Sequence, residues 1–442
     1  MTSDPSAPYT SPFGGGVGAK RRVRGPSSAP SVGQGPLTLT LSPKGEGTLW
    51  PHLGKALLSL AAALVMGSAA IAADVRIGYL GLKDDLRYHP EVAYTRIEIA
   101  PALNPVEGAR LGINDLKIVT DAAGVSLSLD EQQATDAADA SAKVAAMAAA
   151  GERFVILDLP GDVAREVVAA SAALPITLVN ATAPQDALRD LCQPNLVHTG
   201  ASDRMVADTY TQFLRHRNWT KVLILVGNLP RDKEIADAFE ASARRLRLDI
   251  RDRREFTLST DPANREANNT LLITGGTDYD VVFIADSLGE YARYLDYATR
   301  LPRPVIGATG LTASEWHWSW DRDGATQVTL RFQRLAEGRR LMSGPDWSTW
   351  IAAKSIATAY AKARTDDPAK VYEYMRGSRF TIDGSKGYRL TFRPWDGQLR
   401  MPMVLATSNA ITEAAPFPEF LHQTNELDTL GVDQPESKCK AP

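Results

Sequence analysis

Polar side chains that could hold a small molecule follow several β-rich runs of the sequence. In parallel α/β sheets, ligands bind beyond the carboxyl ends of the strands, where loops expose backbone N–H groups and polar side chains. We therefore predict ligand-binding residues at these ends. They are Tyr79, Asp158, Asn180, Ala181 and Thr182 in one half of the chain, and Asn228, Asp286, Ser287 and Thr309 in the other. For Thr182 and Ser287, capping of the following helix is an equal alternative.

Residues for catalysis or metal binding form no comparable pattern. No two of the 6 histidines have the His-x-x-x-His spacing of a metal site, and neither a Gly-x-Ser-x-Gly elbow nor a phosphate-binding loop is present. The paired carboxylates Asp84-Asp85 and Asp366-Asp367 are interpreted as solvated loop residues or helix-start charges. We predict no catalytic residue, no metal and no cofactor. An enzyme whose residues meet only in space stays open as an alternative.

Cys192 and Cys439 are the only cysteines of the chain. Two thiols alone cannot build a four-ligand structural zinc site, whereas a pair in an exported protein can form one disulfide. We predict this disulfide. Two unpaired thiols remain the alternative, because proximity in space cannot be seen in a sequence.

A signal for export lies at residues 55–73. Lys55 precedes an apolar run at 56–67, and the segment ends in small residues up to Ala73. This pattern is typical of a cleaved secretory signal peptide, and the run is short for a membrane anchor. We therefore expect the mature protein in the periplasm. Residues 1–54, rich in Gly, Pro, Ser and Thr, are predicted to be a disordered leader, with a mis-called translation start as the alternative.

The bulk composition is that of a folded protein with more than one core. The chain has 442 residues, of which 44% are hydrophobic and 23% charged. Its 49 basic and 52 acidic residues are mixed along the sequence and give a net charge of −3. Such a mixture has no field that would hold a phosphate backbone, so nucleic acid is not an expected partner.

The elements that must position the polar residues alternate between strands and helices. Short apolar runs bounded by helical segments predict two doubly wound, mainly parallel sheets in series. The first set has strands at 75–80, 124–129, 154–157 and 175–179, and helices at 104–117, 133–150 and 162–173. The second has strands at 222–227, 250–258, 281–285 and 304–307, and helices at 202–214, 233–246, 263–272 and 288–300.

The rest of the chain is too short for a third core. Two amphipathic helices at 346–364 and 367–376 precede turn pairs that predict antiparallel strands. We expect these segments to return to the two lobes and form a multi-strand hinge. The predicted organisation is lobe 1 at 74–198 with a return at about 330–380, lobe 2 at 199–329 with a return at 381–410, and a tail at 411–442.

The element order and several motifs resemble those of the leucine-binding, type I periplasmic substrate-binding proteins of ABC transporters. The residues concerned are the first helix at 104–119, the run 198–203 (HTGASD), and the segment 381–397 with its Thr-Ile-Asp-Gly and Asp-Gly pairs. The resemblance covers about residues 74–410. It implies two lobes that close on a small ligand, and an ABC permease of the inner membrane as a partner.

A narrower resemblance is to a subgroup associated with PQQ-dependent alcohol dehydrogenase systems. The segments 192–199 (CQPNLVHT), 346–350 (DWSTW) and 425–439 are similar to that subgroup. This similarity implies a quinoprotein dehydrogenase system as physiological context and partner; it does not imply that the chain binds PQQ.

One departure from the family concerns the ligand. Amino-acid-binding members hold the α-carboxylate and α-ammonium with small Ser, Ala and Thr residues in two loops. Here the loop at 179–183 keeps an Ala-Thr pair, but the loop at 157–162 carries Asp158 and Pro160 instead. A carboxylate there opposes a ligand carboxylate and favours a cation or a hydroxyl-rich ligand.

The sequence thus predicts the periplasmic solute-binding component of an ABC-type uptake system, with a small polar ligand between the lobes. The alternative is an envelope accessory or sensor protein of a quinoprotein alcohol dehydrogenase system that does not transport.

Overall fold

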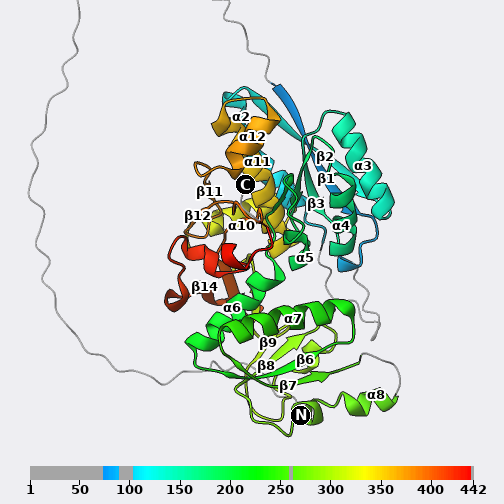
Figure 1. The fold of residues 1–442 in the computed structure, drawn as a ribbon, viewed down its shortest axis with the longest axis vertical. Coiled ribbons are helices and arrows are strands. Elements are labelled where there is room, and N and C mark those ends of the chain that lie inside the picture. The colour runs from blue at the N-terminus through cyan, green and yellow to red at the C-terminus, as the bar shows by residue number, and fades with distance from the viewer. Residues whose placement is uncertain (1–72, 89–102, 258–261, 440–442) are drawn as a thin grey trace, which may run out of the picture. The chain divides into compact units, whose positions relative to one another are not determined.

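A computed structural model describes residues 73–88, 103–257 and 262–439 of the chain, and these belong to one compact unit (Figure 1). The predicted leader and all but the last residue of the predicted signal peptide lie outside the described residues. The fold is α/β, with two separate parallel sheets, as the strand pattern of the sequence predicts. No helix in the described part combines the length and apolar character needed to cross a bilayer.

The first sheet has the strand order β2-β1-β3-β4-β5, and all its strands are parallel. Its elements are β1 (Ala73–Leu82), α2 (Val106–Ala122), β2 (Val125–Ala134), α3 (Ala137–Ala149), β3 (Phe154–Asp158), α4 (Gly161–Ala170), β4 (Thr177–Asn180), α5 (Asp186–Arg189) and β5 (Leu196–His198). Every residue of β3 and β4 is buried, because helices cover both faces of the sheet. We call this sheet with α2–α5 lobe 1.

The second sheet has the order β7-β6-β8-β9 and is also parallel throughout. Its elements are α6 (Asp203–His216), β6 (Lys221–Val226), α7 (Pro230–Arg245), β7 (Asp249–Glu255), α8 (Pro262–Ala267), α9 (Thr270–Ile273), β8 (Val281–Ala285) and β9 (Val305–Gly307). Ser202 caps α6 as its sequence position predicts, with its hydroxyl accepting the Met205 N–H at 3.2 Å. We call this sheet with α6–α9 lobe 2.

The prediction of a helix at residues 288–300 is wrong. Only a short 3-10 helix, Ala292–Tyr294, forms there. The Asp286 carboxylate accepts backbone N–H groups from Gly289, Tyr291 and Ala292 and so holds this segment as a loop. Gly289 and Tyr297 also have positive φ angles, which a right-handed helix excludes.

Segments after lobe 2 run back against both sheets. They are β10 (Thr312–Ser314), α10 (Ala325–Leu335), α11 (Gly344–Ala363), α12 (Pro368–Arg376), β11 (Ile382–Asp383), β12 (Arg389–Leu390), β13 (Met403–Ala406) and β14 (Ile411–Ala415), with short 3-10 helices at Pro418–Phe420, Glu426–Thr429 and Gln434–Glu436. A further 3-10 helix, Leu86–Tyr88, follows β1 in lobe 1. Helix α11 packs on α2 (Figure 1). Gly108 and Gly112 allow this approach, since a Cβ on them would lie 2.1 Å and 2.5 Å from backbone oxygens of α11.

A buried carboxylate between α3 and β3 makes the stability of lobe 1 depend on pH. Burial, together with the nearby Asp130 carboxylate, raises the pKa of Glu152 to about 7. The folded state therefore favours protonated Glu152, and stability falls as the pH rises from about 4.5 through about 7. We expect Glu152→Gln, which keeps the side chain neutral, to raise the free energy of unfolding at pH 8 by about 1 kcal/mol.

Denaturant unfolding at pH 4.5 and pH 8 checks this expectation. The gain from Glu152→Gln should vanish at the lower pH, where the wild-type carboxyl is already protonated. The same change at Glu166, an exposed residue of α4, should have little effect at either pH. An equal gain at both pH values would show that protonation of Glu152 is not the cause.

Candidate ligand-binding site

A buried carboxylate organises the carboxyl end of the first sheet. Asp158 is the last residue of β3 and is fully buried. Its Oδ2 accepts a hydrogen bond from the Tyr79 hydroxyl of β1 at 2.9 Å. Its Oδ1 accepts from the Tyr88 hydroxyl at 2.6 Å, the Thr182 hydroxyl at 2.8 Å and Arg87 Nη2 at 3.1 Å. Three of the predicted residues, Tyr79, Asp158 and Thr182, therefore meet in one cluster.

An arginine that the sequence interpretation missed lies between two carboxylates of this cluster. Arg87 Nη2 is 2.7 Å from Asp85 Oδ2 and 3.1 Å from Asp158 Oδ1, while Nη1 donates to the Thr182 hydroxyl at 3.0 Å. Two carboxylates and one guanidinium give the cluster a formal charge of −1. Asp85 is not a solvated loop residue, because its side chain is only 3% exposed and is held by Arg87. It fits the other interpretation, a helix-start charge, since its carboxylate accepts the Arg87 N–H at 2.9 Å in the 3-10 helix Leu86–Tyr88.

Both tyrosine hydroxyls of the cluster stay protonated at neutral pH. Burial, reinforced by the negative charge of Asp158, raises the pKa of Tyr79 and of Tyr88 well above the ordinary value. The Tyr79 hydroxyl also lies 2.9 Å from Asn104 Oδ1. The cluster thus presents neutral hydroxyl groups and one shared cation around two buried carboxylates, those of Asp85 and Asp158.

Asn180 and Ala181 lie at the same end of the sheet but are used by the protein itself. The Asn180 side chain closes a turn by accepting the Ala183 N–H at 3.0 Å and donating to the Ala183 carbonyl at 2.8 Å. Its Nδ2 is also 3.1 Å from Nδ1 of His198. Ala181 is buried, and its N–H donates to the Leu157 carbonyl at 3.1 Å. These two predicted residues shape the end of lobe 1 from within.

The predicted residues of lobe 2 fall into two groups. Asp286 is buried and caps three backbone N–H groups, and burial raises the pKa of its carboxyl. Thr309 donates to Asp296 Oδ2 at 3.0 Å. By contrast, Asn228 and Ser287 are exposed at their strand ends. Among the predicted residues of lobe 2, these two have exposed side chains.

The residues that were missed sit where a sequence signal exists. Asp85, Arg87 and Tyr88 follow β1 within a few positions, and the carboxyl end of β1 lies beside that of β3 in the sheet. Polar and aromatic residues directly after a predicted central strand could therefore have been included as candidates.

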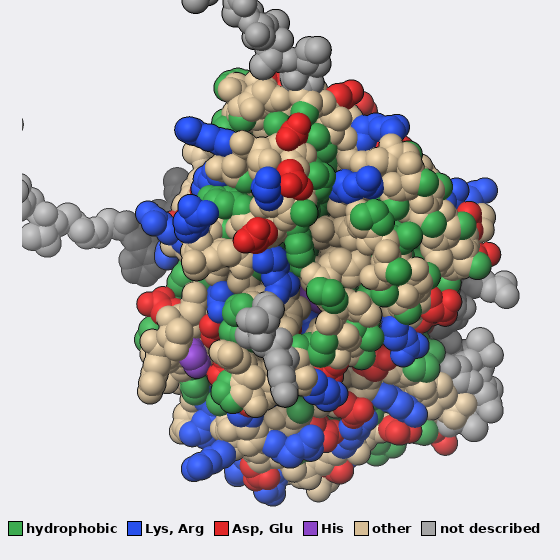
Figure 2. Space-filling view, turned by 45° about the horizontal axis from the view of Figure 1, so that its top comes forward, with side chains coloured by type: hydrophobic (Ala, Val, Ile, Leu, Met, Phe, Trp, Pro, Cys, Tyr) green, Lys and Arg blue, Asp and Glu red, His purple; other side chains and the backbone are tan. Residues whose placement is uncertain are grey.

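Three open pockets of the described residues, of about 300, 480 and 390 Å³, have none of the predicted strand-end residues in their walls. In the described ranges, no group of three or more His, Cys, Asp or Glu side chains is placed to hold a metal ion. On the face drawn in Figure 2, Lys and Arg side chains are interspersed with Asp and Glu.

Cys192 and Cys439 form a disulfide, which confirms the prediction from the sequence. The bond joins the loop before β5 to the end of the described chain, 247 positions later.

Comparison with known proteins places the fold. No protein-family model and no curated protein matches the chain. A branched-chain amino acid ABC transporter periplasmic ligand-binding protein from Burkholderia xenovorans is similar over 83% of this chain and 99% of its own, with a TM-score of 0.66 and 13% identity.

Two ligand-bound structures are also similar. An ABC transporter substrate-binding protein from Desulfitobacterium hafniense in complex with Leu has a TM-score of 0.60 and 16% identity, and covers 77% of this chain and all of its own. A solute-binding protein of an ABC transporter from R. palustris in complex with benzoate has a TM-score of 0.55 and 12% identity, over 75% of this chain and 92% of its own. The chain therefore has the α/β fold of the type I periplasmic binding proteins.

Proposed function

We propose that the chain is a periplasmic solute-binding protein of an ABC-type uptake system and acts by binding rather than by catalysis. The observation that carries this proposal is the hydroxyl-rich cluster around Asp158 at the carboxyl end of a parallel sheet, in a fold shared with substrate-binding proteins. A ligand held between the lobes would favour the closed form, and a permease of the inner membrane would receive it.

The charges at both strand ends limit the ligand chemistry. The cluster of lobe 1 has a formal charge of −1. In lobe 2, Asp286 follows β8, and the Asp232 carboxylate of α7 accepts the N–H of the next residue, Ser287. A free carboxylate on the ligand would be repelled by these groups. We infer a small ligand that is cationic or rich in hydroxyl groups, and expect leucine to bind poorly.

The ligand contacts in lobe 1 are proposed for the outer groups of the cluster. Asp158 already accepts four hydrogen bonds and is fully buried, so its role is to orient its neighbours. Thr182 and Tyr88 are partly exposed, and the Arg87 side chain is 29% exposed. In lobe 2, Asn228 and Ser287 are the exposed partners.

A thermal-shift screen of the purified protein tests the proposal. The panel holds polyols, alcohols, amines, amino acids, carboxylic acids, aldehydes, PQQ and metal ions, and we expect Tm to rise with a polyol or an amine. Calorimetry on the hit should then show at least tenfold weaker binding for Thr182→Val, which removes one hydroxyl and keeps the side-chain shape.

The matched control is Thr120→Val. Thr120 is buried near the end of α2, and its hydroxyl donates to backbone carbonyls of its own helix. The Thr120→Val substitution should leave the affinity for the ligand unchanged. Unaltered binding in Thr182→Val would remove the Asp158 cluster from the proposed site, and a panel with no hit would count against solute binding.

A second candidate is a non-transport accessory or sensor protein of a quinoprotein alcohol dehydrogenase system. The observation in its favour is that four donors of the chain, from Tyr79, Arg87, Tyr88 and Thr182, satisfy the buried Asp158 carboxylate, so this group needs no ligand to be stable. Neighbouring quinoprotein and cytochrome genes without permease and ATPase genes would support this candidate over uptake.

A further inference from the structure

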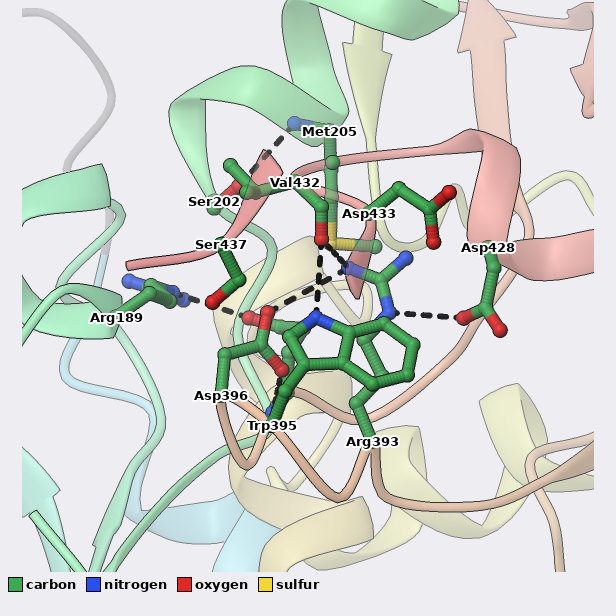
Figure 3. Close-up of polar contacts among 12 residues, drawn as sticks. Arg189, Ser202, Met205, Arg393, Trp395, Asp396, Asp428, Val432, Asp433 and Ser437 are labelled. Carbon is green, nitrogen blue, oxygen red and sulfur yellow. Dashed lines mark hydrogen bonds and ion pairs between the residues drawn. The ribbon is translucent and has the colours of Figure 1, made fainter. Parts of the chain in front are cut away.

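The last described residues of the chain lie across both lobes. We call residues 426–439 the C-terminal strap. The strap carries two 3-10 helices, Glu426–Thr429 and Gln434–Glu436, and ends at the disulfide. Figure 3 shows Asp428, Val432, Asp433 and Ser437 of the strap beside Arg393 and Trp395. Its contacts with the two lobes come from different parts of its length.

The first half of the strap is held by lobe 2. The Gly431 N–H donates to Asp208 Oδ2 of α6 at 2.8 Å. Asp208 is fully buried and is also held by Arg245 of α7 at 2.7 Å. The Thr429 carbonyl accepts from Arg245 Nη2 at 3.2 Å, and its hydroxyl accepts from Gln212 Nε2 at 3.1 Å. These contacts fix residues 429–431 to two helices of lobe 2.

Residues 393–399, between β12 and β13, also hold the strap. Arg393 Nε lies 3.0 Å from Asp428 Oδ1, and Trp395 Nε1 donates to the Val432 carbonyl at 3.2 Å (Figure 3). The same segment pairs with lobe 1, since the Leu399 N–H donates to the His198 carbonyl of β5 at 2.8 Å. The strap is therefore held near the end of β5, where the chain passes from lobe 1 to lobe 2.

The far end of the strap is bonded to lobe 1. Cys439 forms the disulfide with Cys192, and Lys438 Nζ is 2.6 Å from Asp190 Oδ2. All strands and helices of lobe 2, from α6 to β9, lie between Cys192 and Cys439 in the sequence. The disulfide thus closes a covalent loop that contains the whole of lobe 2.

We propose that this strap limits how far the two lobes can separate, and that the Cys192–Cys439 bond is its fixed end. The eight peptide steps from Gly431 to Cys439 span at most roughly 26–29 Å when fully extended. Asp208 is joined to Gly431 by a hydrogen bond and Cys192 to Cys439 by the disulfide, whose Cα atoms are 5.2 Å apart. As long as both ends are held, Asp208 of lobe 2 therefore cannot move farther than roughly 40 Å from Cys192 of lobe 1. Without the bond, the strap is free to peel from lobe 1.

The inference rests on the proposed function only in that the lobes open and close, and its test needs no ligand. Spin labels on Ala145→Cys in α3 and Lys233→Cys in α7, both exposed, report the separation of the lobes by pulsed electron paramagnetic resonance. We expect Cys192→Ser/Cys439→Ser to extend the distance distribution to longer values than in the bonded protein. Circular dichroism verifies that each variant is folded.

A second variant keeps the disulfide and lengthens the strap. Four Gly and Ser residues inserted after Asp433 add roughly 13 Å of reach and should also broaden the distribution toward longer distances. Lys438→Ala, which removes only the exposed ion pair with Asp190, is the matched control and should leave it unchanged.

Distance distributions that superimpose in the bonded, serine and lengthened proteins would overturn the proposal that the strap limits the separation of the lobes. A ligand panel without hits would contradict the proposed solute binding but would not change the distance distributions. Failure of the proposed function and failure of this inference are therefore distinguishable.

Discussion

Asp158→Ala is expected to lower the free energy of unfolding by about 3–5 kcal/mol. The carboxylate is fully buried and receives the hydroxyls of Tyr79, Tyr88 and Thr182 and one N–H of Arg87. With Ala, the hydroxyls of Tyr88 and Thr182 lose this acceptor, and the Tyr79 hydroxyl keeps only Asn104 Oδ1. Arg87 loses one of its two carboxylate partners and keeps Asp85. The cost exceeds that of one lost hydrogen bond because several donors lose an acceptor at once, and the buried Tyr79 hydroxyl cannot turn to water instead.

Urea unfolding followed by circular dichroism measures this loss. Asp162→Ala is the control, because Asp162 is an exposed carboxylate in the first turn of α4, four positions further along the chain. It should cost no more than about 0.5 kcal/mol. If Asp158→Ala cost as little as the control, the carboxylate would not organise the cluster, and the ligand contacts proposed for its neighbours would lose their support.

The two sheets could be predicted because their strands have a strong sequence signal. Strand β3 (Phe154–Asp158) and strand β6 (Lys221–Val226) are near-continuous apolar runs, since helices cover both faces of each sheet. The ends of such runs fix where the carboxyl edge lies. For that reason Tyr79, Asp158 and Thr182 could be named together from the sequence, although they are far apart along it.

The side-chain partners at that edge could not be predicted in the same way. Asp85 and Arg87 read as ordinary polar loop residues, and nothing local marks that Arg87 crosses to Asp158, 71 positions away. The loop after β8 was missed for a related reason. The Asp286 side chain captures the N–H groups that a helix would use, and a helical pattern of residues does not reveal this competition.

Charged residues of the C-terminal strap illustrate the same limit. Asp428 is buried and paired with Arg393, which precedes the strap in the sequence, whereas Glu436 of the strap is about half exposed. Both acidic residues lie in the same polar stretch of sequence. Only long-range packing decides which of them become internal ion pairs, so the burial of each had to come from the structure.

Asp428→Ala is the second substitution with a large expected effect, about 3–5 kcal/mol of unfolding free energy. Asp428 Oδ1 lies 3.0 Å from Arg393 Nε and 2.7 Å from Arg400 Nε, and the Arg393 side chain is 1% exposed. Asp428 is the carboxylate that Arg393 and Arg400 share. Removing it leaves these two positively charged guanidinium groups close together without that negative charge between them. Arg393 keeps backbone carbonyls of Leu427 and Leu430 and a distant carboxylate, Asp396, at 3.7 Å. The two neutral carbonyl groups and the more distant Asp396 do not replace the carboxylate of Asp428 at 3.0 Å.

Glu436→Ala separates this effect from a general loss of charge on the strap. Its carboxylate is 3.8 Å from Arg204 and 3.9 Å from Arg245 and is 45% exposed, so water screens both pairs. It should change the free energy of unfolding by no more than about 1 kcal/mol. Denaturant unfolding of both variants gives the comparison, with the disulfide intact in each. Equal effects would mean that Asp428 contributes only as a surface charge and that the strap is not anchored where Arg393 and Arg400 meet it.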